Sequence, residues 1–482
     1  MNRWLAGGFC LVLLGVACTF RPVVQGDGVN YFAYLHSLAV DHDLDFRDEY
    51  RAAMAAGISV DPTLTATPTV TGLVANFQPV GAAVLAFPFY AAALAMHASG
   101  EPQFGRGFVM AFTIASLFYG LLALALSARL AAASTGSQNA ALAAAGIAAL
   151  TTPLAFYLLY DPSYSHTFSA FAVSAFVLVW WRGREQRGAA GWFVLGLLGG
   201  LLGLVRIQDA PLAAIALIDL PRAGSWGPHE TWRLHRVFLR AWPFIPGLAL
   251  AFGPQLLVEH TLFGTWLPYR PAAFAPSFWP GHYVDVLVSS HDGLLTWSPI
   301  FALAAVGLFL LPDRRLALAA LFAFVVELVI EGSAPDWWGG LAFGMRRFLD
   351  LLPFVTVGLA ELARRLQPWA VALGGSLLAL WNVVLVANFL YVMRGDRDPG
   401  HAGLFAGQVE ALRYLPRLFA QGGVVRSLVL WRALHEPFRP GFAFMLLALE
   451  AACLLAALWA AQAWRPAWRA AWRAAAAVRS PS

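Results

Sequence analysis

Lysine is absent from this sequence of 482 residues, so all 32 basic side chains are arginines. The absence excludes chemistry that depends on a lysine amine, such as Schiff-base formation. It also means that any phosphate bound by a basic side chain would meet the planar, forked guanidinium group of arginine.

Charged residues are scarce: they make up 12% of the chain, whereas 59% of the residues are hydrophobic. A soluble protein carries about twice that charged fraction. Helices satisfy their own backbone polar groups in lipid, so the sequence predicts an all-α, polytopic membrane protein. The net charge of +5 is explained better by arginines that orient membrane spans than by a nucleic-acid partner.

Cysteine is also rare, and Cys10, Cys18 and Cys453 all lie in hydrophobic segments. Their spacing matches neither a metal site nor a disulfide framework. The sequence assigns no metal-binding residues and no particular cofactor. The alternative is a divalent cation at Asp41-His42-Asp43, where three ligand-type side chains adjoin.

Apolar runs that approach or reach the length of a bilayer span recur along the chain. They fall at about 4–20, 80–97, 106–129, 140–159, 166–181, 190–205, 209–220, 241–258, 297–312, 315–331, 348–363, 369–393 and 441–463. Cytoplasmic loops are rich in arginine, and placing the arginine-bearing connections inside predicts about twelve spans with both termini in the cytoplasm. We expect the run 4–20 to be an uncleaved first helix rather than a signal peptide.

Successive spans must cross the membrane in alternating directions. The run at about 80–97 does not fit, because both of its ends would have to lie outside the cytoplasm. Pro79 and Pro88 favour a broken or tilted segment, so we interpret the run as a juxtamembrane helix at the outer interface. The alternative is that it spans the bilayer and that the orientation of the N-terminal part is inverted.

The first polar stretch after the N-terminal apolar run holds the leading catalytic candidate. Asp27 lies between Gly26 and Gly28, a few residues beyond that run. A carboxylate placed there can approach a membrane-borne substrate and act as a general base towards an acceptor hydroxyl or amine. The alternative is a turn at a helix end, since Gly-Asp-Gly also suits turns.

A second outer turn, from Asp161 to His166, is very short and carries two ionisable side chains. Such side chains at a membrane surface are costly if they are merely structural. Asp161 could assist Asp27 or orient a sugar, and His166 could donate to a phosphate. Alternatively, Asp161 or Ser163 caps the helix that follows.

Two arginines fall on the outer side, where the positive-inside rule does not explain them. Arg206 interrupts an apolar stretch just before Asp209, and Arg270 follows Tyr269. A guanidinium group that faces a polar pocket is a candidate phosphate ligand, so both arginines are predicted to bind substrate. For Arg206, a structural ion pair with Asp209 is an equal alternative.

The late outer segments combine aromatic and basic side chains. His291 is a candidate for substrate contact, with loop packing as its alternative. Trp337 and Trp338 offer flat faces that suit sugar rings. Arg346 stands at a helix start, where a phosphate would gain from the guanidinium and from the backbone amides. For the adjacent Arg347, the alternative to phosphate binding is snorkelling to lipid headgroups.

Taken in order, these pieces resemble the GT-C superfamily of polytopic glycosyltransferases, which includes protein O-mannosyltransferases and bacterial aminoarabinose transferases. The resemblance covers most of residues 1–365. It rests on four motifs: Gly26-Asp27-Gly28 followed by Tyr31, the segment Asn76 to Gly81, Asp161 in the second outer loop, and Trp338-Gly339-Gly340 followed by Phe343-Gly344-Met345-Arg346.

The resemblance implies a role for each motif. Asp27 would be the catalytic base, Asp161 would support it, and outer arginines would hold the lipid phosphate, with Tyr31 in the substrate site. Residues 1–365 would form the GT-C-like catalytic module. Residues 366–482 would add C-terminal helices, an outer loop at 394–440 and a basic cytoplasmic tail. The first motif departs from many members, which have a second carboxylate in place of the glycine after Asp27.

The resulting hypothesis is an inner-membrane glycosyltransferase whose active site faces the periplasm. It would transfer one sugar, with inversion, from a polyprenyl-phosphate donor to a lipid, glycan or protein acceptor, among membrane lipids. The alternative is a transporter or lipid flippase, which Glu259, Glu327 and Glu450 in or near apolar segments would support. Polarity gathered at one face and the lack of repeat symmetry argue against that alternative.

Overall fold

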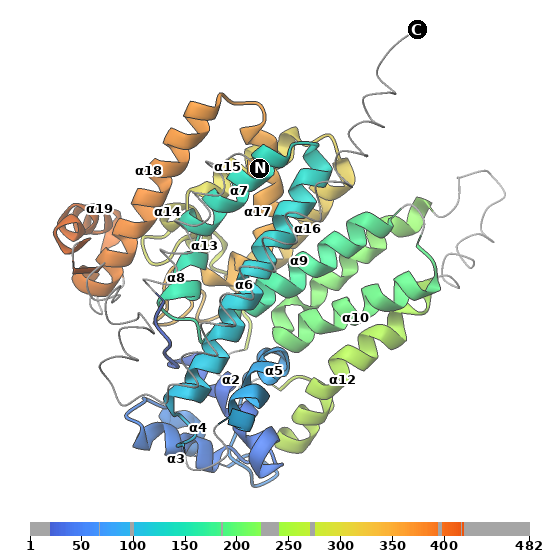
Figure 1. Ribbon diagram of the computed structural model, residues 1–482, viewed down its shortest axis with the longest axis vertical. Helices are drawn as coiled ribbons and strands as arrows, with labels where there is room; N and C mark the ends of the chain where they lie inside the picture. Colours follow the sequence, from blue (N-terminus) through green and yellow to red (C-terminus); the bar gives the residue numbers. More distant parts are fainter. Residues whose placement is uncertain are drawn as a thin grey trace. The chain divides into compact units, whose positions relative to one another are not determined.

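The computed structural model describes residues 20–66, 68–96, 101–184, 187–222, 241–269, 275–393, 398–415 and 417–418. Across these ranges every regular element is a helix, which confirms the all-α prediction (Figure 1). Residues 21–418 form one compact unit. The run 4–20, Arg270, most of the loop 394–440 and the basic tail lie outside the described residues, and the division near residue 365 stays a prediction.

Three stretches in the described part of the chain are long and apolar enough to cross a membrane: α6 (Arg106–Thr135), α16 (Arg314–Ser333) and Pro368–Met393. The last comprises α18 (Pro368–Ala387) and the π-helix η5 (Asn388–Met393). The total of about twelve spans stays a prediction. The bundle also contains α7 (Gln138–Thr151), α8 (Leu154–Leu159), α9 (His166–Gly183), α10 (Ala189–Val205), η2 (Ile207–Arg222), α12 (Phe244–Phe263), α15 (Ile300–Leu310) and α17 (Leu352–Ala363).

Prolines divide two of the apolar runs into separate helices. The run at 140–159 becomes α7 and α8, because Pro153 lacks a backbone donor and begins the second helix. The run at 348–363 starts within the 3-10 helix η4 (Arg346–Leu351) and continues as α17, which has a proline in its first turn. The limits of the apolar runs therefore differ from the limits of the helices.

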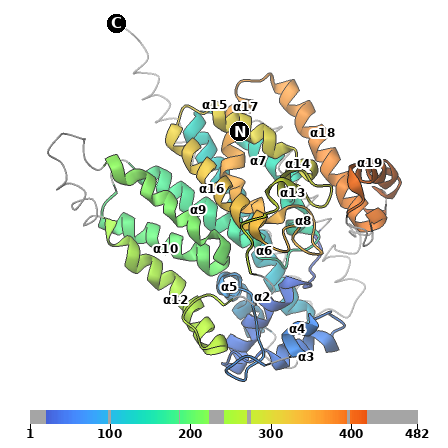
Figure 2. The ribbon, with the colours of Figure 1, turned by 180° about the vertical axis from the view of Figure 1, so that it is seen from behind.

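The helix α5 (Gly81–Met96) occupies the predicted juxtamembrane segment. Its 16 residues make it about 24 Å long, shorter than the ~30 Å hydrocarbon core of a bilayer. Figures 1 and 2 show α5 nearly end-on, whereas α6 and α12 run along the page, so α5 crosses these long helices. The backbone N–H of Val80 donates to Oε1 of Gln255 at 3.0 Å and fixes its start. The position of α5 at the membrane interface stays a prediction.

Short helices gather with α5 at one end of the described bundle (Figure 1). They are α2 (Asp27–His36), the π-helix η1 (Ser37–Asp41), α3 (Arg47–Ala55) and α4 (Pro62–Ala66). The rings of Phe32 in α2 and Tyr90 in α5 lie 6.0 Å apart. The hydroxyl group of Tyr50 in α3 donates to Oδ1 of Asn30 at 3.0 Å. These contacts hold α2 between α3 and α5.

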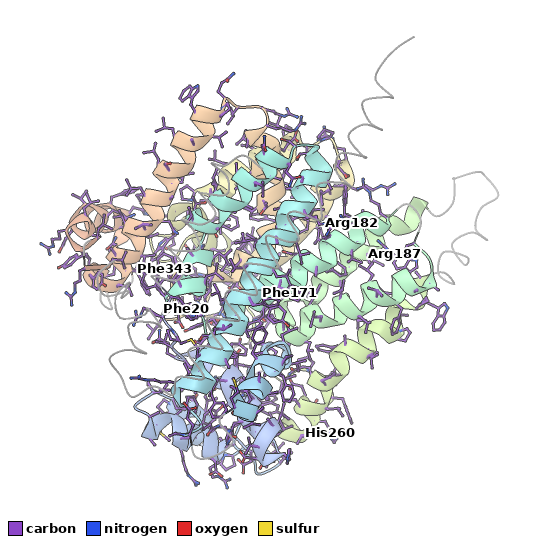
Figure 3. The ribbon with its side chains drawn as sticks, viewed as in Figure 1. Phe20, Phe171, Arg182, Arg187, His260 and Phe343 are labelled. Atoms are coloured by element: carbon purple, nitrogen blue, oxygen red, sulfur yellow. The ribbon has the colours of Figure 1, made fainter. Side chains whose placement is uncertain are left out.

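Segments later in the chain form the short elements α13 (Tyr283–Val288), α14 (Leu294–Trp297), α19 (Gly400–Ala411) and η6 (Leu412–Tyr414). The loop 334–345 joins α16 to η4. The hydroxyl group of Tyr157 donates to the carbonyl oxygen of Phe343 at 3.0 Å and accepts from its N–H at 2.9 Å. Oδ1 of Asp292 accepts from the N–H of Gly344 at 2.9 Å. The loop is therefore fixed beside α8, where Figure 3 labels Phe343.

Candidate active site

Asp27 begins α2, and the glycines beside it let this loop approach the turn from Asp161 to His166. Gly26 has a φ of 55°, which glycine adopts without strain. A Cβ atom added to Gly28 would lie 2.2 Å from Oγ of Ser163, so the contact leaves room only for glycine. The Asp27 side chain is 42% exposed. The motif therefore presents an accessible carboxylate next to the turn that holds Asp161.

Asp161 is buried, in contrast to Asp27. Its Oδ2 accepts from Nε2 of Gln25 at 2.9 Å, and its Oδ1 accepts from the hydroxyl group of Ser163 at 2.9 Å. Burial raises the pKa of Asp161 from 3.8 to about 6, while the two hydrogen bonds oppose the rise. Because Gln25 belongs to the same loop as Asp27, the Asp161 carboxylate ties that loop to the second turn.

Arg346 forms an ion pair with Asp27, and its charge also lowers the pKa of Asp161. Its Nη2 lies 3.6 Å from Oδ2 of Asp27, and its side chain is only 6% exposed. Nη1 donates to the carbonyl oxygen of Gly339, and the guanidinium carbon lies 5.3 Å from the centroid of the Tyr164 ring. A Cβ atom on Gly339 would stand 2.5 Å from Nη1. Three residues predicted from separate stretches of sequence are thus brought into one cluster.

Tyr31 connects α2 to the loops on either side. Its hydroxyl group donates to Oε1 of Gln78 at 2.9 Å and accepts from the hydroxyl group of Ser165 at 2.9 Å. Burial is the main cause that raises the pKa of Tyr31 to about 12. The amide of Asn76 donates to the carbonyl oxygen of Asn30 at 2.9 Å. Tyr31 holds the Asp27 loop in place, and its contact with substrate stays a prediction.

His166 and Arg206 form a buried pair. Nη1 of Arg206 donates to Nδ1 of His166. Because guanidinium can only donate, Nδ1 accepts and the imidazole carries its proton on Nε2. Nε of Arg206 lies 3.7 Å from Oδ1 of Asp209. The structure favours the ion-pair alternative for Arg206, whose guanidinium is buried and already paired. Its role as a phosphate ligand stays a prediction.

Trp337, Trp338 and His291 form one aromatic cluster. The rings of His291 and Trp338 stack with centroids 5.6 Å apart, and the two tryptophan rings meet edge to face at 5.9 Å. His282 stacks on Trp337 at 5.6 Å. Trp337 is buried and Trp338 is partly exposed, so Trp338 offers the more accessible face. It directly precedes Gly339, whose carbonyl oxygen holds Arg346.

Arg347 differs from its neighbour. Nη1 donates to Oε2 of Glu331 and Nη2 donates to Oδ2 of Asp336, each at 2.6 Å. The guanidinium group therefore ties η4 to the last turn of α16 and to the loop after it, which favours a structural ion pair over snorkelling. Sequence reasoning also misses Tyr164, which contacts Arg346. An aromatic residue three positions after a candidate carboxylate is the signal that points to it.

A surface pocket adjoins Asp41-His42-Asp43, the segment predicted to bind a cation. His42 and Asp43 line this pocket of about 540 Å³, and Asp43 already accepts from the N–H of Asp45 at 3.1 Å. In the described part of the chain, a different group brings three carboxylates together. Its members are Asp209, Glu327 and Asp350.

The helical bundle, the crossing helix α5 and the apolar spans define a polytopic helical membrane protein. A similar solved structure is the crystal structure of ArnT from Cupriavidus metallidurans in the apo state. The match has a TM-score of 0.51 and 16% sequence identity, and it covers 88% of this chain and 78% of that chain. No protein-family model and no curated protein matches the sequence. At this identity the likeness establishes the fold.

Proposed function

We propose that this protein is an inner-membrane glycosyltransferase that acts at the periplasmic face. It transfers one sugar, with inversion, from a polyprenyl-phosphate donor to a lipid, glycan or protein acceptor. The observation that carries the proposal is the pair of Asp27 and Arg346, 3.6 Å apart, in a chain with the fold of ArnT. One side chain is an accessible base, and the other is an anchored cation.

Asp27 acts as the general base. The acceptor oxygen or nitrogen attacks the anomeric carbon as the bond from that carbon to the phosphate oxygen breaks, and the bonding electron pair leaves with the phosphate. Asp27 takes the acceptor proton. Attack opposite to the leaving group inverts the anomeric centre. Proton transfer by a positioned side chain contributes about 10²–10⁴-fold to the rate.

Arg346 stabilises the negative charge that develops on the leaving phosphate. Its guanidinium is fixed by the Gly339 carbonyl oxygen and the Tyr164 ring before any substrate arrives. A preorganised cation costs no reorganisation during the reaction. Its burial also strengthens its electric field, because the local dielectric constant is lower than that of water. Trp338 supplies an aromatic face for the sugar on the same loop.

Asp161 is a positioning residue in this scheme. It accepts from Gln25 at 2.9 Å, two residues before the base. Its burial keeps it away from the acceptor, whereas Asp27 is accessible. The two carboxylates therefore have separate tasks.

The substitution Asp27→Asn tests the assignment of the base. In nanodiscs with a panel of radiolabelled polyprenyl-phosphate sugars, wild-type protein should release polyprenyl phosphate with one donor. Asp27→Asn should lower that rate by about 10²–10⁴-fold, with an unchanged elution profile and melting temperature. The matched control is Asp48→Asn, because Asp48 is an outer carboxylate that is 79% exposed. It should keep full turnover.

Near-normal turnover by Asp27→Asn would overturn the role of Asp27 as the base. The second candidate function is transport, which the fully buried Glu327 in α16 favours, since ionisable residues within spans often mark transport pathways. Movement of a lipid or solute between leaflets, with no turnover of any donor, would select that candidate.

A further inference from the structure

Three carboxylates that the transfer reaction does not use meet in the protein interior. Asp209 comes from η2, Glu327 from α16 and Asp350 from η4. One oxygen from each lies within 4.8 Å of the others. Their exposed fractions are 0%, 0% and 1%. Bringing three ionisable acids so close in a buried place is costly unless something compensates their charge.

The described side chains compensate only part of that charge. Nε of Arg206 lies 3.7 Å from Oδ1 of Asp209, and Oδ2 of Asp209 accepts from the hydroxyl group of Ser169 at 2.5 Å. Both oxygens of Glu327, both oxygens of Asp350 and Oδ1 of Asp209 have no hydrogen-bond donor among the described residues. The Glu327 carboxylate is thus an unpartnered, fully buried group directed at two aspartates.

A divalent cation would balance this group. Three carboxylates and one guanidinium leave two negative charges, which a 2+ ion neutralises. The donor set contains only carboxylate oxygen, which suits hard cations rather than zinc or copper. Such ions take about six to eight oxygen ligands, enough for all five undonated oxygens. Two protons shared between carboxylates would also neutralise the group. Each proton bridges two oxygens, so the two protons together would satisfy four of the five oxygens and leave one without a donor.

We propose that Asp209, Glu327 and Asp350 bind one hard divalent cation of the Mg²⁺, Mn²⁺ or Ca²⁺ class. The site is separate from the surface sequence Asp41-His42-Asp43. Asp350 lies four residues after Arg346 in the same helix, η4, and Asp209 contacts Arg206, which holds His166. The cation therefore joins three elements and fixes the helix that carries Arg346. The inference does not depend on the transferase activity.

Metal analysis of the intact protein tests this site. Protein purified in nanodiscs, chelated and reloaded with Mn²⁺, should bind about one ion per chain by mass spectrometry of the metal. Electron paramagnetic resonance should show the bound ion's spectrum. Glu327→Gln and Asp350→Asn should each lower the affinity for Mn²⁺ at least tenfold. Glu259→Gln is the matched control, because Glu259 is buried but accepts from Gln255 and from the N–H of Tyr269, and it should bind like wild type.

Wild-type protein provides a second measurement that needs no variant. Chelation should lower its melting temperature, and Mn²⁺ should restore it. Asp27→Asn should retain the ion, which separates this site from the catalytic base. Wild-type protein that binds no Mn²⁺, Mg²⁺ or Ca²⁺ and melts identically with and without chelator would overturn the proposal and identify the group as protonated carboxylic acids.

Discussion

Asp27 and Asp161 show how strongly environment separates two residues of one type. Asp27 is partly open to solvent beside Arg346. Asp161 is buried and accepts from Gln25 and Ser163, and burial raises its pKa to about 6. The sequence predicts both carboxylates for one site, because each lies in an outer turn. It does not predict which of the two is covered, since that depends on how the glycine-flanked loop packs against Ser163.

Glu49 in α3 gives a residue-scale prediction about pH. Its side chain is fully buried, and neither carboxylate oxygen has a hydrogen-bond partner in the described structure. Burial, with added repulsion from Asp41 and Asp43, raises its pKa from 4.5 to about 8. Between these values the folded protein holds a proton that the unfolded chain has lost. The free energy of unfolding should therefore fall as the pH rises from about 4.5 to about 8.

The comparison of wild type with Glu49→Gln measures this effect. Glutamine stays neutral at every pH, so the variant should lose this part of the decline. The melting temperature of the variant minus that of wild type should be about 2–4 °C larger at pH 8 than at pH 5. The adjacent exposed residue provides the control, and Asp48→Asn should keep the wild-type pH profile. Parallel profiles of wild type and Glu49→Gln would show that Glu49 is ionised in the fold.

At the scale of elements, glycines decide how closely α10 and α12 approach. A Cβ atom on Gly196 would lie 2.1 Å from the carbonyl oxygen of Phe244, and one on Gly247 would lie 2.3 Å from that of Phe193. Small residues let membrane helices pack backbone to backbone. The sequence shows two apolar, glycine-containing runs. It does not show which glycines face each other, because the rotation of each helix is set by the whole bundle.

Gly247 and Gly253 both lie in α12, and substitutions at these two positions test the close contact. Gly247→Ala should destabilise the protein by about 1–3 kcal/mol, because the added methyl group meets backbone atoms that cannot move independently. Gly253 has nothing within 4 Å of an added Cβ atom, so Gly253→Ala should be neutral or slightly stabilising. Melting temperatures in detergent compare the two. Equal melting temperatures would mean that the close approach of α10 and α12 is absent in solution.

Proline placement marks another limit of prediction at this scale. Because successive spans alternate in direction, the run at about 80–97 is predicted to lie at the interface. The structure forms the helix α5 there, and its place at the interface stays a prediction. Hydropathy alone does not divide the run at 140–159, although Pro153 ends one helix and begins another. A proline ends a helix because it lacks a backbone N–H group. The helix ends within an apolar run can therefore be predicted only if each proline in that run is considered separately.

At the scale of the whole molecule, the site joins segments that are distant in sequence. The order of the motifs and their expected side of the membrane predict that Asp27, Asp161 and Arg346 belong together, and the structure brings them together. The buried carboxylates show the opposite case. The sequence predicts that Asp209 pairs with Arg206, and it offers Glu327 as support for a transport function. No sequence pattern assigns a role to Asp350. Their meeting depends on the packing of η2, α16 and η4, which no local pattern encodes.

The sidedness of the whole molecule gives the last prediction. Figure 3 places Arg182 and Arg187 at the opposite end of the bundle from His260. Near the arginine end, Nη1 of Arg184 lies 2.6 Å from Oδ2 of Asp313. Arginine-rich ends favour the cytoplasm, so the end with α2 and α5 should face the periplasm.

Labelling of single cysteines in intact cells measures this orientation. In a background with Cys10, Cys18 and Cys453 changed to serine, Asp48→Cys in α3 should react with a membrane-impermeant maleimide. Gln138→Cys, an exposed position at the start of α7, should react only after the membrane is opened. The reverse pattern would place Asp27 and Arg346 in the cytoplasm. In that orientation the acceptor and the sugar donor would have to be presented from the cytoplasmic leaflet, and the periplasmic assignment would fail even if transfer itself were shown.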